Sequence, residues 1–579
     1  MSSSRRGLVI VLLLIFLAVG VSIVCIGLLT LTTAAPPSVP DQAALYLKLN
    51  APWSEIERID LFGSFGPQVL TLRDTINTIH RAKRDSRVKT LVIQPAAEGA
   101  LWGQLQEIRA AIDDFRGSGK PVVAYLESAG AQEYYIASAA NRIILMPAGG
   151  IDLSGLATYE LFFRGALDKL GVFPDLLHRG DYKTASNTFT EKGFTPAHKD
   201  MSRSLNKDWF DQLVHAIAEG RKQQDADVRK VIDEGPFLAE EAKKAGLVDA
   251  LGYEDQIDDA PPVQGTRRID GDTYQRATAW SGPIGTERIA LLYAVGTIAS
   301  GKSAFDSPGG QVLGSDTFDS WVRKVRIDPS IRAIVIRIDS PGGSAIASDV
   351  MWRELMLTRE VKPVIVSMGD VAASGGYYMA VPAHVIVAEP GTITGSIGVV
   401  TGKFVLKDTM EKIGVGVDSV SDGKLAEINS PFKPFSKDER AKIEEQLQAT
   451  YELFLSRVAE GRHSTPAKID QVAQGRVWTG RQAKDLGLVD ELGGLDAAVQ
   501  IAKQRAKIDP KKDVEFVVYP PRRSIYDVIA DPLGNNSTQT GLSLFTRQPA
   551  TRVLDAALSM LHLFRRGEPL TLMPNVFVH

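Results

Sequence analysis

The sequence predicts an α/β protein in which one N-terminal transmembrane helix precedes two tandem βαβ domains. Three observations support this fold class. A long uncharged apolar run opens the chain, the remainder repeats itself once, and each repeat alternates short β-branched runs with amphipathic helical patterns. The chain has 579 residues, more than a single hydrophobic core usually serves, so two or more domains are expected.

The apolar run extends from Gly7 to Thr33 and carries no charge. Roughly 20 apolar residues suffice to cross a bilayer, and this run is longer than the apolar core of a cleavable signal peptide. The small residues after it could mimic a cleavage site, but Pro36 should hinder cleavage there. A retained anchor within residues 1–35 is therefore favoured over a removed signal.

Charges around the run predict its orientation. Arg5 and Arg6 precede it, and no Lys or Arg follows it until Lys48. Because positive charges stay on the cytoplasmic side, the N-terminus is expected in the cytoplasm. The remaining chain is expected on the other face of the membrane.

The rest of the chain is a tandem duplication. A shift of about 243 positions aligns "DSRVKTLVIQ" at Asp85 with "DPSIRAIVIR" at Asp328, and further matches follow in the same order, down to "AKKAGLVDALG" against "AKDLGLVDELG". We predict four segments after the anchor: a first repeat over 43–254, a Pro/Gly-rich linker over 255–285, a second repeat over 286–514, and a C-terminal extension over 515–579 with no assigned role.

Each repeat is expected to form a buried sheet flanked by helices. The runs "TLVIQ", "PVVAYL" and "RIILM" predict strands in the first repeat, and "AIVIRI", "PVIVSM" and "VIVAE" predict their counterparts in the second. Helical patterns such as "LWGQLQEIRAAIDDF" and "ASDVMWRELMLTRE" lie between them. A long charged helix is expected after Ser436, and the matching helix of the first repeat after Thr195.

Composition argues against several classes of function. The net charge of −3 gives no basic surface for nucleic acid, and the eight histidines show no metal-ligand spacing. "GTIASGKS" at Gly296–Ser303 fits a phosphate-loop pattern, but Pro and Gly follow it where a helix is required. Neither a metal nor another cofactor is expected.

The two repeats differ at a candidate nucleophile. "DVAASGGYYMAV" places Ser374 before Gly375, whereas the aligned "ESAGAQEYYIAS" has Ala131 instead of the serine. A serine that attacks an acyl carbon needs a base and N–H donors for the oxyanion. Gly375 and Gly343, on the "SPGG" turn, are the candidate donors. The alternative is that these small residues only permit a tight turn.

The candidate base lies in the other repeat. "HRGDYKTAS" contains Lys183, whose aligned partner in the second repeat is Ala426. A lysine can act as a base if burial lowers its pKa from about 10.4 toward neutrality. Taken alone, Lys183 could be a solvated loop residue. Since one repeat has only the serine and the other only the lysine, a divided Ser-Lys dyad is the stronger interpretation.

Together, "DSPGGSA", "MGDVAASGGYYMA", "GTITGSIGV" and "GDYKTAS" resemble bacterial signal peptide peptidase A in its long tandem form, a family with a fold like ClpP and the crotonases. The resemblance implies that Ser374 is the nucleophile and Lys183 the general base. It also implies that Ser396 hydrogen-bonds the lysine, and that Gly343 and Gly375 supply the oxyanion N–H groups.

The resemblance further implies a homotetramer in the bacterial inner membrane, with its catalytic domains on the periplasmic side. Its expected substrates are released signal peptides and other short hydrophobic peptides. Two alternatives remain open at this point. One is a catalytically inactive scaffold of the same fold, and the other is an acyl-CoA enzyme of crotonase fold that uses the same glycine turns.

Overall fold

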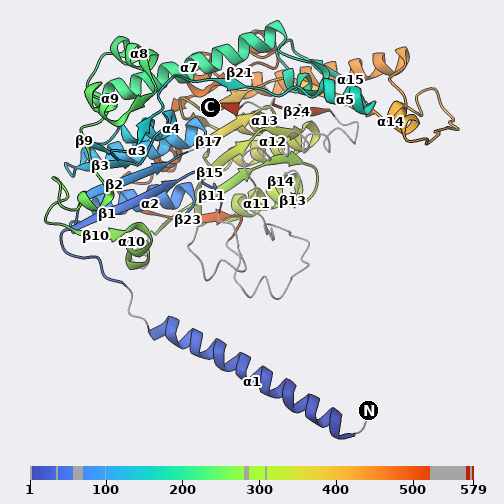
Figure 1. Ribbon diagram of the computed structural model, residues 1–579. Coiled ribbons are helices and arrows are strands. Elements are labelled where there is room, and N and C mark those ends of the chain that lie inside the picture. Colours follow the sequence, from blue (N-terminus) through green and yellow to red (C-terminus); the bar gives the residue numbers. More distant parts are fainter. Residues whose placement is uncertain are drawn as a thin grey trace.

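The computed structural model describes residues 3–33, 37–56, 70–97, 99–278, 286–306, 310–521, 569–573 and 577–578. The two repeats lie side by side in Figure 1, the first in blue to green and the second in yellow to orange. Strands and helices alternate through both, which confirms the α/β class.

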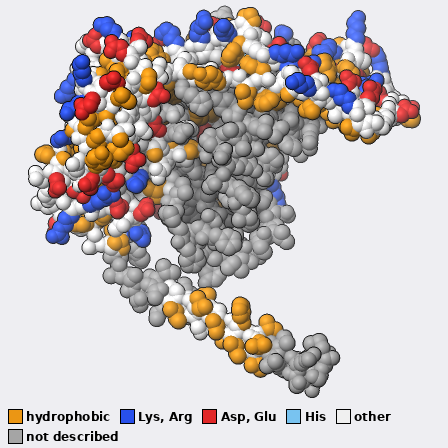
Figure 2. Space-filling view, viewed as in Figure 1, with side chains coloured by type: hydrophobic (Ala, Val, Ile, Leu, Met, Phe, Trp, Pro, Cys, Tyr) orange, Lys and Arg blue, Asp and Glu red, His pale blue; other side chains and the backbone are white. Residues whose placement is uncertain are grey.

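Helix α1 (Ser3–Thr33) coincides with the expected membrane anchor and stands apart from the globular body (Figure 1). Apolar side chains on it are exposed, among them Phe16 at 82% and Ile23 at 65%. Figure 2 shows hydrophobic side chains along this helix, below the body with its many charged side chains. In the part of the chain that the structure describes, no helix is found that is both long and apolar enough to cross a membrane. The anchor therefore stays a prediction.

The first repeat is built on a six-stranded parallel sheet. Its strands, in spatial order, are β10 (Arg267–Asp270), β1 (Ala43–Asn50), β2 (Val88–Ala96), β3 (Val122–Leu126), β4 (Arg142–Leu145) and β9 (Ala250–Leu251). Parallel neighbours require crossover connections. Helices α2 (Leu72–Arg84), α3 (Trp102–Gly117) and α4 (Ala131–Ala137) lie in these crossovers.

The second repeat has the corresponding sheet. From one edge its strands are β23 (Val514–Tyr519), β11 (Glu287–Val295), β15 (Ile331–Ser340) and β17 (Val364–Ala373), after which β17 pairs with both β18 (Val385–Ala388) and β19 (Ile393–Gly395). β22 (Glu491–Leu492) pairs with β18, and β21 (Val477–Thr479) with β19. Helices α11 (Ser315–Ile327), α12 (Ala345–Arg359) and α13 (Gly375–Ala380) correspond to α2, α3 and α4.

Two segments contribute more structure than the sequence predicts. Part of the expected linker forms β10 and α10 (Gly271–Thr278), and β10 pairs with β1. The start of the expected C-terminal extension belongs to β23, which pairs in the same parallel way with β11. Both are edge strands, which pair on one side only and need no strongly apolar run. The polar sequence "RRID" of β10 therefore gave little strand signal.

A third sheet joins the repeats. Its order is β13 (Ala304–Asp306), β14 (Gly310–Gly314), β12 (Thr297–Ala299), β16 (Gly342–Ser344), β24 (Leu570–Leu572), β20 (Val399–Val405) and β7 (Phe173–Arg179). β7 comes from the first repeat and runs antiparallel to β20 of the second, with pairing from Phe173 to Arg179. The first repeat thus extends a strand across the second.

The two long charged helices are confirmed. α7 (Pro196–Arg221) begins after Thr195, and α15 (Lys437–Gly461) begins after Ser436, whose hydroxyl accepts the backbone N–H of Glu439. In return, the Glu439 carboxylate accepts the backbone N–H of Ser436.

Charged side chains buried between the repeats also connect them. Arg337 on β15 is fully buried and donates to the carboxylates of Glu55 and Glu107, both from the first repeat. Arg337 Nη1 also donates to Ser367 Oγ at 3.0 Å. A buried charge needs such partners, so this contact fixes one repeat against the other.

Candidate active site

Ser374 occupies the sharp turn between β17 and α13. Its backbone angles are φ 56° and ψ −111°, a conformation that residues other than glycine rarely adopt. The backbone N–H of Ser374 donates to the carbonyl of Gly395 at 2.7 Å, and the side chain is fully buried. Such held backbone strain is concentrated at functional sites, which favours a role for Ser374 beyond a simple turn.

Lys183 reaches this turn because β7 pairs with β20. It lies in the turn after β7, which ends at Arg179, and is also fully buried. Its backbone is held by a loop of the second repeat, where a β-carbon on Gly475 would lie 2.5 Å from the Lys183 nitrogen. Gly475 has a φ of +77°, and our sequence analysis did not single it out. Gly475 follows the short helix α16 (Pro466–Val472), and nothing in the local sequence predicts that it contacts the other repeat.

The three side chains expected to act together meet within one chain. Lys183 Nζ lies 2.7 Å from Ser374 Oγ. It also donates to Ser396, at 2.8 Å to the carbonyl oxygen and 3.0 Å to Oγ. Ser396 is buried and has a φ of 52°, so its turn, like that of Ser374, holds an uncommon backbone conformation.

Burial favours the neutral form of this lysine. Loss of solvation lowers the pKa of the Lys183 ammonium well below its ordinary value. A neutral amine has two N–H groups and one lone pair, which matches two contacts to Ser396 and one to Ser374. The geometry therefore suits an amine that can accept the serine proton.

The expected oxyanion glycines flank Ser374. A β-carbon placed on Gly342 would lie 2.7 Å from the Gly375 nitrogen and 3.1 Å from the Ser374 β-carbon, so the "SPGG" turn and the serine turn are in contact. Gly343 follows with a φ of +154°, and a β-carbon there would lie 2.0 Å from the carbonyl oxygen of Ile298. Only glycine fits at these close approaches.

A strand from the C-terminal extension covers the same turn. β24 pairs antiparallel with β16, with Thr571 opposite Gly343, and it also pairs with β20. The Thr571 hydroxyl donates to the Gly343 carbonyl at 3.2 Å. This contact could not be predicted, since the extension has no counterpart in the first repeat.

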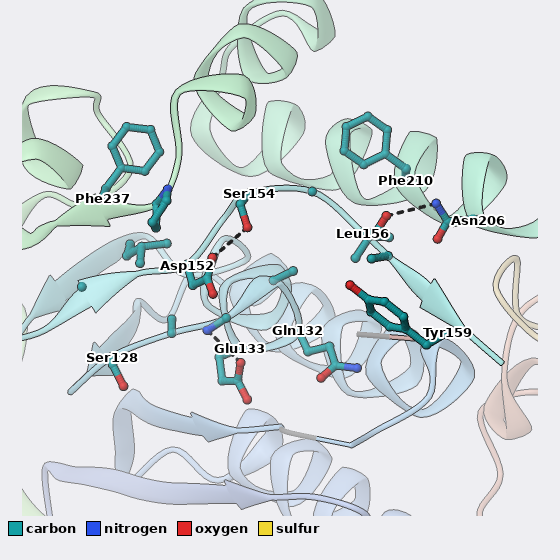
Figure 3. A pocket seen from close by; sticks show the side chains of 18 of the residues that line it. Ser128, Gln132, Glu133, Asp152, Ser154, Leu156, Tyr159, Asn206, Phe210 and Phe237 are labelled. Carbon is teal, nitrogen blue, oxygen red and sulfur yellow. Dashed lines mark hydrogen bonds between the residues drawn. The ribbon is translucent and has the colours of Figure 1, made fainter. Parts of the chain in front are cut away.

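The first repeat has a hollow at the corresponding place. It has a volume of about 1360 Å³, and Ala131, Gln132 and Glu133 are among the residues that line it. Figure 3 shows Gln132 beside Tyr159, with Phe210 farther away near Leu156, and Glu133 accepting the backbone N–H of Gly130. The hollow thus presents alanine, glutamine and glutamate where the second repeat has a serine and two glycines.

The structure also bears on the phosphate-loop pattern and on possible metal sites. "GTIASGKS" lies in β12 and the turn into β13, and the next helix in the described chain, α11, begins only at Ser315. It therefore lacks the helix that a phosphate loop requires. Among the described residues, no cluster of His, Cys, Asp and Glu could hold a metal ion.

The family model described as peptidase family S49 matches residues 114–260 and 356–509, one region in each repeat. The chloroplastic serine protease SPPA of Arabidopsis thaliana is 35% identical over 472 residues, covering 80% of this chain and 70% of that protein. Protease 4 of Salmonella typhi is 36% identical over 491 residues, covering 82% of this chain and 78% of that protein.

Among solved structures, the 1510-N membrane-bound stomatin-specific protease is similar at 16% identity, covering 41% of this chain and 99% of its own. Its TM-score of 0.25 is too low to support any argument about this chain.

Proposed function

Because the chain belongs to peptidase family S49, we propose that it is a serine endopeptidase in which Ser374 and Lys183 form the catalytic dyad. One observation carries the proposal. The Lys183 amine and the Ser374 hydroxyl are 2.7 Å apart, and both side chains are fully buried. This distance is within the reach required for proton transfer from a nucleophile to its base.

The reaction begins with attack of Ser374 Oγ on the carbonyl carbon of a peptide bond. Neutral Lys183 takes the hydroxyl proton and then donates it to the leaving amine as the C–N bond breaks. Water hydrolyses the resulting ester, with Lys183 again as the base. Ser396 acts as a positioning residue, because its two oxygen atoms hold the amine toward Ser374.

The backbone N–H groups of Gly343 and Gly375 are proposed to bind the oxyanion. Support comes from the contact between their two turns and from the absence of a side chain at either position. Donors that are already fixed in place stabilise the transition state without reorganising during the reaction.

The proposed substrates are short hydrophobic peptides, including released signal peptides. Each repeat is proposed to have a ClpP/crotonase-like fold, and α1 is proposed to anchor the chain in the bacterial inner membrane with its catalytic domains outside the cytoplasm. Arg5 and Arg6, which lie at the start of α1 before its apolar run, and the exposed apolar side chains of α1 support this location. A protein held there has direct access to peptides released from the membrane.

We propose a homotetramer because one arm of the second repeat, residues 413–422, has no strand to pack against in the part of the chain that the structure describes. β7 of the first repeat pairs with β20, but the aligned segment of the second repeat, residues 416–422, forms no strand. Val420 in this segment is fully exposed, and Ile413 before it is 66% exposed. In a closed ring, this arm would lie on the first repeat of the next chain.

Labelling with a fluorophosphonate tests the dyad directly, because the probe reacts with activated serines. Wild type should be labelled, whereas Ser374→Ala and Lys183→Ala should not. Lys192→Ala is the matched control, since Lys192 lies close after Lys183 in the first repeat but is largely exposed. Labelling of Lys183→Ala at the wild-type rate would refute the assignment of the base. No labelling of wild type would favour the inactive scaffold.

A further inference from the structure

The C-terminal strand β24 lies where a peptide substrate would have to lie. It fills the space between β16, which carries Gly343, and β20, which continues from the Ser396 turn. Peptides commonly bind proteases and related proteins by adding a strand to an exposed edge through main-chain hydrogen bonds. In this chain, that edge is already paired.

The pairing register brings one carbonyl of β24 to the catalytic turn. The backbone N–H of Met573 donates to the Pro341 carbonyl at 3.0 Å, and that of Ala345 donates to the Pro569 carbonyl at 3.2 Å. Hydrogen-bonded pairs alternate along an antiparallel ladder, so the pair between these two, Thr571 with Gly343, is also hydrogen-bonded. The carbonyl of Thr571 therefore faces the N–H of Gly343.

The same carbonyl lies close to the nucleophile. A β-carbon on Gly342 would be 2.0 Å from the Thr571 oxygen, 2.7 Å from the Gly375 nitrogen and 3.1 Å from the Ser374 β-carbon. One small volume thus contains the Thr571 carbonyl, both candidate oxyanion glycines and the serine. This is the position that the carbonyl of a scissile bond would take.

The strand is held by side chains as well as by its backbone. Leu570 and Leu572 are each 2% exposed and pack with Phe189 and Val400 in one apolar cluster. Thr571 is fully buried. Beyond it, β25 (Phe577–Val578) pairs with β6 (Thr158–Tyr159) of the first repeat. The tail is therefore paired with strands of both repeats.

We propose that residues 569–573 are a built-in competitor, a segment of this chain that occupies the substrate groove and must leave before a peptide can bind. The inference rests on the proposed function, since it assigns the groove beside Ser374 as the substrate site. An attached segment competes at a high effective concentration, so a free peptide binds only in the fraction of molecules whose groove is open.

The test measures binding and does not depend on catalysis. The probe is a fluorescein-labelled peptide with the sequence of residues 568–575, EPLTLMPN, followed by fluorescence anisotropy. All chains are full length at the N-terminus, are kept in detergent and carry Ser374→Ala, so that none can remove its own tail. One chain keeps the tail, a second ends at Glu568, and two more carry Thr571→Pro or Thr571→Ser.

The truncated chain should bind the peptide at least about tenfold more tightly than the intact chain. This is the ratio expected if the groove of the intact chain is open in about a tenth of the molecules. Thr571→Pro removes the N–H that pairs with Gly343, so this chain should also gain affinity. Thr571→Ser keeps both the N–H and the hydroxyl and should bind as the intact chain does.

A second peptide, N-methylated at its threonine, locates the binding. It cannot donate to the Gly343 carbonyl, so the truncated chain should bind it at least about tenfold more weakly. Equal affinity of the truncated and intact chains for the unmodified peptide would overturn the proposal, and so would a failure of both to bind. Neither result would bear on the dyad, which the labelling experiment tests separately.

Discussion

The two repeats share a fold but have kept different parts of one candidate site. The second repeat has Ser374 and Ser396, where the first has Ala131 and Leu153. The first has Lys183, whose aligned position in the second is Ala426. The structure brings the retained halves together at 2.7 Å, because β7 of the first repeat lies on β20 of the second. After a duplication, each copy can therefore lose what its neighbour supplies.

Substitution of Ser374 or Lys183, the residue that each repeat has retained, should have the largest effect on activity. Ser374→Ala and Lys183→Ala should each lower kcat/KM for a short hydrophobic peptide by about 10⁴-fold or more, because the two groups act as one unit. Circular dichroism should show an unchanged fold.

Restoring the serine in the first repeat sharpens the same comparison. The double variant Ala131→Ser, Ser374→Ala should be as inactive as Ser374→Ala alone, since the second repeat has Ala426 at the position aligned with Lys183. Lys207 lines the same hollow as Ala131, but its side chain is 74% exposed and pairs with Asp211 at 2.6 Å. Recovered activity in the double variant would show that the first repeat has a base of its own.

The contact between the repeats should carry the next largest effect. Arg337→Ala leaves the buried carboxylates of Glu55 and Glu107 without their cation and should destabilise the protein by about 3–5 kcal/mol. Arg332→Ala is the matched control on the same strand, because Arg332 is 44% exposed and its pair with Glu287 should contribute at most about 1 kcal/mol. Urea unfolding measures both, and equal effects would argue against a structural role for the buried cluster.

A smaller loss is expected from the residue that positions the amine. Ser396→Ala removes one of the two oxygen atoms that hold Lys183, so kcat should fall by about 10- to 100-fold with little change in KM. Ser154→Ala, just after the aligned Leu153 of the first repeat, should leave kcat unchanged. A change confined to KM in Ser396→Ala would assign Ser396 to substrate binding instead.

The mildest test changes only the pH. Burial lowers the pKa of Lys183, and only the neutral amine can accept the serine proton. As the pH rises through this lowered pKa, the neutral fraction grows, so kcat/KM should rise and then level off well below the pKa of an ordinary lysine, about 10.4. A rate that is already constant from pH 6 to 9, with chemistry rate-limiting, would contradict a lysine base.

Much of this arrangement could be predicted because the duplication supplied an internal comparison. The apolar runs gave the central strands, and the mismatches at Ser374 and Lys183 pointed to the divided site. The capped helix after Ser436 was also clear from its acidic first turn.

Other features left no local trace in the sequence. β10 and β23 are edge strands with no aligned motif to mark them, and the polar sequence of β10 also has little apolar pattern. The contacts of Gly475 with Lys183 and of Thr571 with Gly343 join segments far apart in the chain, and only the folded structure brings them together. Whether Lys183 meets Ser374 within one chain was equally undetermined by sequence alone.

Because β7 must pair with β20 to form the proposed site, the order of synthesis limits when the chain can become active. Lys183 and Ser374 are 191 residues apart in the sequence, and the ribosome delivers the lysine first. While the first repeat folds, its lysine has no serine to activate. The proposed dyad can form only after most of the second repeat has been synthesised and folded. If the chain emerges through a membrane as proposed, beside the kind of peptide it is proposed to cut, it would thus remain inactive until its second repeat has folded.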